Sequence, residues 1–273
     1  MKTHLLLSLV TLLATACGGS TSAGASETLT LTGSSTVAPL AAELGVRFES
    51  THPNLRVDVQ SGGSSRGIAD ARAGHADLGM SSRALKDSEG DLVATTIAHD
   101  GVGLIAHASQ SLDGLTSDQV RAIFTGEITD WSELGGTPGP ITVVNKAEGR
   151  ATLEVFLEHF GLEARQIHAD VVAGENEQAI KTVVGTPGAV GYVSIGTAEV
   201  DIAAGVAIKL LALDGVPASS TEVTAGRYPM ARPLNLVTSG VPSLRALEFI
   251  EFARAPANAD LVRREAFVPV AAE

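Results

Sequence analysis

The 273-residue sequence contains a single cysteine, and only 4% of its residues are aromatic. One cysteine cannot form a disulfide within the chain or supply a zinc site built from several thiolates. The shortage of aromatic rings disfavours a site that binds bases by stacking. Basic residues are also scarce, since 19 lysines and arginines stand against 31 acidic residues, for a net charge of −12. We therefore expect no nucleic-acid partner, which would require a basic surface.

Apolar residues make up 44% of the chain and charged residues 18%. This balance excludes a disordered chain and allows a sizeable core, in one large domain or in two lobes. Glycine is common, with 29 copies, which indicates many tight turns. The histidines lack the spacing of a metal site, so we expect neither a metal nor a cofactor.

The N-terminus has the pattern of an export signal. Lys2 precedes an apolar run over residues 5–16, which is too short to span a bilayer. Small residues then lead to Cys17, as in a bacterial lipobox, so we expect residues 1–16 to be a lipoprotein signal peptide and Cys17 to be lipidated. The alternative is an ordinary signal peptide in which Cys17 is incidental. Residues 17–26, rich in Gly and Ser, would form a flexible tether, and the mature chain would carry a net charge of −13 with 18 bases and 31 acids.

From residue 27 onward, short apolar runs alternate with stretches of helical periodicity, which predicts an α/β fold. A helix with apolar positions at Val37, Leu40, Leu44 and Phe48 follows the first run. Thr116 and Gln119 resemble a capping box that opens another helix. The strands are expected at residues 28–32, 55–60, 102–108, 141–145, 189–195, 208–213 and 234–238.

Three of the strands lead into a polar loop that opens a helix. The loops are Gly33-Ser34-Ser35-Thr36, then 61–67 with Ser64 and Ser65, and then 146–152 with Lys146, Arg150, Ala151 and Thr152. The first N–H groups of a helix lack intrahelical partners, and the helix dipole is positive there, so such a loop can bind an anion. One loop alone would more simply be a helix cap. Three loops that converge would supply the many donors that an oxyanion needs.

A fourth polar loop contains Ser82 and Arg83. Arg83 would either bind the anion or pair with a surface acid. Lys146 and Arg150 flank the third loop, at a helix N-terminus that ordinarily favours acids, and their position favours anion binding over a purely solvated role.

The segments GSSTVAPL, SGGSSRGI, DLGMSSRAL, HDGVGLIAH, LTSDQVRAIFTGEITDW, PGAVGYVSIG and YPMARPLNLVT resemble, in this order, the phosphate-binding proteins of bacterial phosphate ABC transporters. The resemblance covers most of the chain after the tether. It implies a type II periplasmic-binding-protein fold of two α/β lobes joined by a two-strand hinge, with phosphate between the lobes. We expect lobe 1 at residues 27–101 and 234–273, and lobe 2 at residues 102–233.

Carried over by position, the resemblance assigns phosphate binding to Ser35, Thr36 and Ser64. The family pattern of Arg followed by Gly-Ser-Gly-Thr is here Lys146 with Gly149-Arg150-Ala151-Thr152, which keeps positive charge. Ser82 replaces an aspartate that in some members accepts the proton of phosphate, and Asp100 would substitute for it if it faces the cleft. The expected anion site comprises Ser34, Ser35, Thr36, Ser64, Ser65, Ser82, Arg83, Lys146, Arg150, Ala151 and Thr152.

An enzyme remains an alternative, because residues 63–67 also fit G-x-S-x-G between a strand and a helix. Ser65 would then be the nucleophile of a hydrolase, with His99, His107, His159 or His168 as base and Asp100 or Asp130 to orient it. No His-Gly-Gly oxyanion loop precedes the motif, and this hypothesis explains one loop where anion binding explains three.

The sequence therefore predicts an exported, lipid-anchored solute-binding protein in the periplasm or on the cell surface, and not an enzyme. It would be a monomer that captures phosphate and passes it to the membrane permease of an ABC transporter. The alternatives within this class are a protein for another oxyanion, such as sulfate or molybdate, and a phosphate sensor that works without a transporter.

Overall fold

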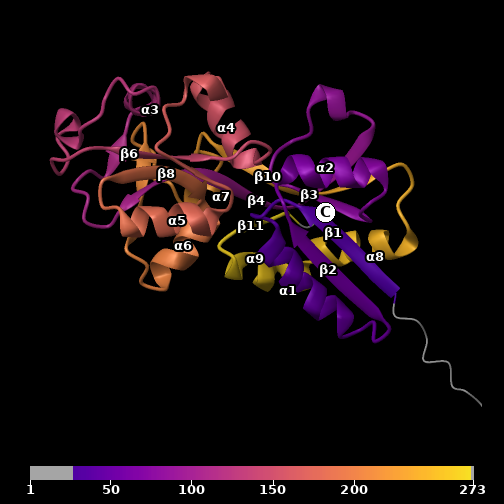
Figure 1. Ribbon diagram of the computed structural model, residues 1–273. Coiled ribbons are helices and arrows are strands. Elements are labelled where there is room, and N and C mark those ends of the chain that lie inside the picture. Colours follow the sequence, from indigo (N-terminus) through magenta and orange to yellow (C-terminus); the bar gives the residue numbers. More distant parts are fainter. Residues whose placement is uncertain (1–26, 272–273) are drawn as a thin grey trace, which may run out of the picture.

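The structure, a computed structural model, describes residues 27–271. Two α/β lobes lie side by side, and the long strands β4 (Leu92–His107) and β10 (Ala231–Ser239) pass between them (Figure 1). The predicted two-lobed α/β architecture with a two-strand hinge is thus confirmed. The signal peptide, Cys17 and the tether expected from the sequence lie outside the described residues.

The strands of residues 27–271 form one continuous hydrogen-bonded system in the order β2-β1-β3-β10-β4-β8-β6-β7, with β9 and β11 also pairing with β4 and β5 pairing with β9. Apart from β4 and β10, the strands are β1 (Glu27–Gly33), β2 (Leu55–Ser61), β3 (Leu78–Ser81), β5 (Gly114–Leu115), β6 (Thr142–Lys146), β7 (Val171–Ala173), β8 (Ala189–Ser194), β9 (Ile208–Leu213) and β11 (Val268–Pro269).

The α-helices cover both faces of the sheet in each lobe (Figure 1). They are α1 (Ala38–Glu49), α2 (Ser64–Ala73), α3 (Ser117–Phe124), α4 (Ala151–Phe160), α5 (Asn176–Gly185), α6 (Ile195–Ala203), α7 (Ser220–Thr224), α8 (Leu244–Arg254) and α9 (Ala259–Arg264). Among the described residues, no helix combines the length and the apolar character that a membrane crossing requires.

In lobe 1, β1 contributes Leu29 and Leu31 to a core that also holds Leu40 and Leu44 of α1 and Phe249 of α8. On the opposite face of this sheet, α2 packs Ile68 against Leu92 and Val237. The alternation of side chains along a strand explains why the two faces need separate helices. The face covered by α2 brings the start of this helix to the ends of β1 and β3.

In lobe 2, neighbouring residues of β4 enter different cores, which is the period-2 pattern of a strand buried on both faces. Leu104 packs with Phe124 of α3 and Phe156 of α4, whereas Ile105 packs with Ile180 of α5. The capping box predicted at the start of α3 is present: the Thr116 side chain accepts a hydrogen bond from the Gln119 N–H at 3.2 Å.

The two hinge strands are antiparallel neighbours, and Arg232 of β10 lies directly opposite Asp100 of β4. β4 begins at Leu92, ten residues before the strand expected at 102–108, because its first half pairs with β10 and its second half with β8 and β9. Its first half, LVATTIAHDG, alternates less regularly and contains polar residues, so the sequence pattern missed it. We keep residues 27–101 with 234–273, and 102–233, as proposed lobe bounds.

Candidate functional site

The first loop leaves β1 at a glycine that no other residue could replace without a clash. Gly33 has φ +132°, and a Cβ at this position would lie 2.3 Å from the Met80 carbonyl oxygen. Its own carbonyl accepts hydrogen bonds from the N–H groups of Gly62 and Gly63, both at 2.8 Å. The first loop is therefore tied by its backbone to the second loop.

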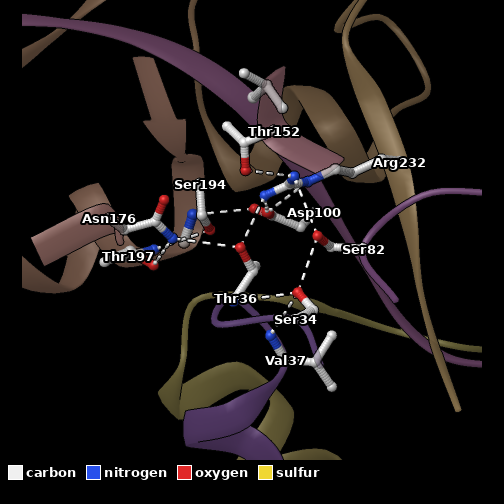
Figure 2. A network of polar contacts seen from close by, with 12 residues as sticks. Ser34, Thr36, Val37, Ser82, Asp100, Thr152, Asn176, Ser194, Thr197 and Arg232 are labelled. Carbon is white, nitrogen blue, oxygen red and sulfur yellow. Dashed lines mark hydrogen bonds and ion pairs between the residues drawn. The ribbon is translucent and has the colours of Figure 1, made fainter. Parts of the chain in front are cut away.

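Ser34 holds the first loop in shape. Its Oγ accepts from the N–H groups of Thr36 (3.2 Å) and Val37 (3.4 Å) and donates to Ser82 Oγ at 3.0 Å (Figure 2). With its hydroxyl proton already used on Ser82, Ser34 orients its neighbours. The loop after β3, which carries Ser82, is thereby joined to the loop after β1.

The second and third loops come from different lobes and touch each other. Gly63, with φ +96°, precedes α2, and Gly149, with φ +77°, precedes α4. The Ser65 N–H donates to the Gly149 carbonyl at 3.2 Å. The N-termini of α2 and α4 therefore face each other across the cleft between the lobes.

The predicted loops do meet, around a small pocket. Eight of the eleven residues expected in the anion site line it, together with Gly63; these are Ser34, Ser35, Thr36, Ser64, Ser82, Arg150, Ala151 and Thr152. Within residues 27–271, the backbone N–H groups of Ser35, Ala151 and Thr152 donate no hydrogen bond to the rest of the chain, as expected at the first turn of a helix. The pocket is thus lined with available donors.

An ion pair between the hinge strands lies at the centre of these loops. The Arg232 guanidinium donates to Asp100 Oδ2 from Nη2 (2.8 Å) and Nε (3.1 Å), and each side chain is only 1% exposed (Figure 2). The other carboxylate oxygen, Asp100 Oδ1, accepts from the Gly196 N–H at 3.2 Å. Asp100 therefore lies behind Arg232, which occupies one of its oxygens, and it does not line the pocket itself.

Arg232 also contacts hydroxyl groups of both lobes. Its Nη1 donates to Thr152 Oγ1 at 3.0 Å and to Ser82 Oγ at 3.3 Å, and its Nη2 donates to Thr36 Oγ1 at 3.2 Å. A hydroxyl that accepts a hydrogen bond still has one proton to donate. Ser64 Oγ is in the same state, because it accepts from the Ser82 N–H at 3.1 Å. Four hydroxyl groups around the pocket are thus prepared as donors.

Lys146 lies just behind this pocket. Its Nζ donates to the Glu175 carbonyl (2.8 Å) and to Asn176 Oδ1 (3.2 Å), and the residue is 3% exposed. Burial, reinforced by the nearby charge of Arg232, lowers the pKa of Lys146 to about 7. Asn176 in turn donates to Thr36 Oγ1 at 3.3 Å, so Lys146 reaches the pocket through one amide.

Arg150 lines the pocket and passes close to Gly63. A Cβ added to Gly63 would lie 3.0 Å from the Cδ of Arg150. The Arg150 side chain is 19% exposed, and its guanidinium pairs with Glu175 at 2.8 Å. Because this contact uses one side of the planar fork, other N–H groups stay available for an anion.

Two predicted residues point elsewhere. Arg83 forms ion pairs with Glu89 (2.7 Å) and Glu154 (2.9 Å) and does not line the pocket. Ser65 directs its hydroxyl to Glu154 Oε1 at 3.1 Å. In residues 27–271 no hydrogen bond joins Ser65 to a histidine, so Ser65 lacks the hydrogen-bonded base that a hydrolase nucleophile uses. Nor does this part of the chain hold a group of three or more side chains able to bind a metal.

Arg232 and Asn176 are site residues that the sequence analysis did not select. Arg232 had a local signal, because a charge sits in an apolar strand that the resemblance places at the hinge, and buried charges need partners. Asn176 had none, since it is an ordinary residue at the start of α5. Its approach to Thr36 exists only because the lobes face each other.

Comparison with known proteins relates this chain to a wider group. Residues 18–255 match a family model described as a PBP superfamily domain. The phosphate-binding protein PstS of Bacillus subtilis is 27% identical over 251 residues, covering 90% of this chain and 82% of that protein.

Solved structures are similar over nearly the same span. A Clostridium perfringens chain, described as a phosphate ABC transporter substrate-binding protein and crystallised with bound phosphate, superposes with a TM-score of 0.84 at 29% identity, covering 90% of this chain and 100% of that one. An ABC-type phosphate transport receptor from Vibrio cholerae gives a TM-score of 0.73 at 28% identity, with coverages of 89% and 100%.

Proposed function

The chain belongs to the family of proteins that carry the PBP superfamily domain, and from that premise we propose that it captures inorganic phosphate between its lobes and delivers it to an ABC permease. The observation that carries this proposal is the pocket where the loops before α1, α2 and α4 meet. Donors from both lobes converge there, and Thr36, Ser64, Ser82 and Thr152 each keep a hydroxyl proton to give.

The charges around the pocket suit a small anion. Arg232 is balanced by Asp100 and Arg150 by Glu175, so the fixed side-chain charges nearly cancel. The favourable field then comes from the helix N-termini and their N–H groups. Lys146 adds a charge that an anion would stabilise, since a nearby negative charge favours its protonated form. The acidic chain as a whole therefore does not oppose anion binding.

Closure couples binding to recognition. A ligand that contacts Thr36 of lobe 1 and Thr152 of lobe 2 is bound fully only when the lobes approach, so it shifts the protein toward the closed state. A permease can distinguish this closed shape from the open one. This is binding and transfer without chemistry on the phosphate, so we propose a carrier and not an enzyme.

Phosphate is favoured over other oxyanions by the names of the relatives, which are phosphate-binding proteins. The position of Ser82, where some members have an acidic acceptor, leaves Asp100 as the buried carboxylate nearest to the pocket. Sulfate and molybdate are therefore the competitors against which phosphate must be tested.

Isothermal calorimetry on tag-free protein stripped of bound anion tests the proposal, with phosphate, arsenate, sulfate and molybdate as ligands. We expect phosphate and arsenate to bind more tightly than sulfate and molybdate. Absence of heat and of thermal shift with all four anions would refute anion binding. Tighter binding of sulfate or molybdate would refute the phosphate assignment alone.

A pair of arginine variants locates the site. Arg150→Ala removes a charged donor from the pocket and should weaken phosphate binding by about 1.5–3 kcal/mol, roughly 10- to 150-fold in Kd. Arg165→Ala is the matched control, because Arg165 also pairs with a glutamate of lobe 2 but is 81% exposed. Equal affinities for the two variants would remove Arg150 from the site.

We propose further that the mature protein is a monomer held at the membrane through a lipidated Cys17, which lies outside the described residues. Mass analysis of the mature N-terminus should find a diacylglyceryl group on Cys17; an unmodified, later start would contradict the anchor.

A fluorophosphonate probe, which labels reactive serines, tests the carrier function against the hydrolase alternative. Labelling that disappears in Ser65→Ala would overturn the carrier function.

A further inference from the structure

A carboxylate of lobe 2 reaches across the cleft to three residues of lobe 1. Glu154 lies on α4, two residues after Thr152. Its Oε2 is 2.9 Å from Arg83 Nε and 2.5 Å from Lys86 Nζ, and its Oε1 accepts from Ser65 Oγ at 3.1 Å. All three partners come from lobe 1, and the helix that carries Glu154 also carries the pocket residue Thr152.

The lobe 1 side of this contact is built independently of Glu154. Glu89 accepts from Arg83 Nη1 at 2.7 Å and Nη2 at 2.9 Å, and from the Lys86 N–H at 2.8 Å. These bonds hold the pKa of Glu89 near 2, so it stays ionised at neutral pH. Burial lowers the pKa of the Arg83 guanidinium, but the carboxylates of Glu89 and Glu154 outweigh it and keep this pKa above its usual value.

Glu154 is therefore an extra partner that Arg83 does not need for its own neutrality. Arg83 is already paired within lobe 1, and among the described residues Lys86 has no other carboxylate within ion-pair distance. Lys86 is therefore the cation of this loop whose carboxylate partner comes from lobe 2. Asp87 of the same loop and Glu158 and His159 of α4 line the adjoining cavity.

These contacts can exist only while the cleft is closed. Separating the lobes would break the two ion pairs and the one hydrogen bond of Glu154, whereas the Arg83–Glu89 pair would remain. Arg83 and Glu154 are shielded, with exposures of 7% and 21%, so their attraction is stronger than for an open surface pair. Lys86 is 55% exposed, so its ion pair contributes less. An interaction present in one of two states shifts the population toward that state.

We propose that Glu154 is a positioning residue that latches the two lobes together by bridging Arg83, Lys86 and Ser65 in the closed state. Rather than contacting the anion, it sets how long the cleft stays closed around it. The latch lies on the wall of a cavity of about 640 Å³ that both lobes line and that extends to Arg232. Opening the latch would therefore widen the space that leads to the centre of the site. This inference rests on the proposed function, because the latch is argued to keep a bound anion in the closed cleft.

Glu154→Gln tests the latch, since the amide oxygen can still accept from Ser65 while the charge is lost. We expect the Kd for phosphate to rise about five-fold or more, mainly through a faster off-rate in stopped-flow experiments. Glu158→Gln is the matched control, one turn further along α4 and on the same cavity; it should bind as the wild type does. The double variant Lys86→Met/Glu154→Gln should lose less than the sum of the single variants.

A second experiment measures the distance between the two lobes directly. Spin labels at Ser88→Cys in lobe 1 and Ala164→Cys in lobe 2, both exposed positions, report the interlobe distance in a Cys17→Ser chain, with and without saturating phosphate. We expect Glu154→Gln to reduce the population with the short distance, and Glu158→Gln to leave it unchanged.

The outcomes separate the latch from the proposed function. If the wild type binds no phosphate but shows a short-distance population that Glu154→Gln reduces, the phosphate assignment fails and the latch stands. If Glu154→Gln leaves affinity, off-rate and distances as in the wild type, the latch is overturned. A wild type without any short-distance population, with or without phosphate, also overturns it, because no closed state would exist to be held.

Discussion

Replacing Arg232 by glutamine would test how much the centre of the cleft depends on its buried ion pair. The change leaves the Asp100 carboxyl group, whose side chain is 1% exposed, without its cationic partner and with the Gly196 N–H as its remaining donor among the contacts described above. Breaking a buried pair by removing one partner costs about 3–5 kcal/mol, because the remaining charge stays desolvated. The variant would also lose the bonds that Arg232 gives to Thr36, Ser82 and Thr152.

The magnitude matters because the free energy of unfolding of a whole protein is about 5–15 kcal/mol. Arg232→Gln should therefore lose a large share of its stability. The double variant Asp100→Asn/Arg232→Gln carries no charge at these two positions, and an amide pair can still form hydrogen bonds, so it should recover at least half of the loss. It should nevertheless bind phosphate far more weakly, since the hydroxyl groups lose the cation that orients them.

Urea denaturation followed by circular dichroism would measure both variants, provided that the slope of the transition is unchanged. Calorimetry on the same samples measures their affinity for phosphate. A loss below about 1 kcal/mol for Arg232→Gln, at the level of an exposed pair, would refute the reasoning. A double variant no more stable than the single one would also refute it.

Two further predictions concern the backbone and the buried lysine. Gly33→Ala should lower the free energy of unfolding by about 3 kcal/mol or more, because the new Cβ would lie 2.3 Å from the Met80 carbonyl oxygen. Gly74→Ala is the control, also at positive φ but in open space, and it should cost only about 1–2 kcal/mol. Equal losses of stability for the two variants on urea denaturation would contradict this. For Lys146, a folded pKa of about 7 against about 10.4 in an unfolded chain means that the unfolded state binds more protons between pH 7 and pH 10. Stability should thus rise across this window by up to about 1.4 kcal/mol per pH unit relative to Lys146→Met, and parallel pH profiles of the two proteins would argue against it.

Local sequence signals predicted most of the secondary structure. The strand expected at 208–213 has those bounds in the structure, and the strands expected at 28–32 and 55–60 differ by at most one residue at each end. These segments combine an apolar pattern with glycine or polar residues at their ends, which decide the structure locally. The first half of β4 was missed because its polar residues are stabilised by the neighbouring strand β10.

The sequence also indicated which loops could bind an anion, and for the same local reason. Glycines at positive φ and helix N-termini with hydroxyl residues depend only on neighbours in the chain. Whether three such loops meet could not be decided locally. Their convergence depends on the parallel pairing of β1 with β2 and β3, and on the way in which β4 and β10 connect the lobes.

Long charged side chains were the least predictable part of the site. Arg83 sits in a polar loop like its neighbour Ser82, yet Glu89 and Glu154 draw its guanidinium away from the pocket. Arg232 lies in the segment YPMARPLNLVT, whose resemblance assigned it no role, yet it contacts both lobes. The direction of such a side chain depends on where its partners lie in space, and that depends on the packing of distant elements.

By itself, then, the sequence determined the α/β class, the strand–loop–helix units and the donors that each loop offers, because backbone conformation and helix capping are local. The tertiary structure alone decided the composition of the site. It placed the Asp100–Arg232 pair between the hinge strands, buried Lys146 behind Asn176 and brought Glu154 of one lobe to Arg83 and Lys86 of the other. Electrostatic interactions act through space, as between Asp100 and Arg232, which the chain separates by 132 positions, so only the folded arrangement assigns their partners.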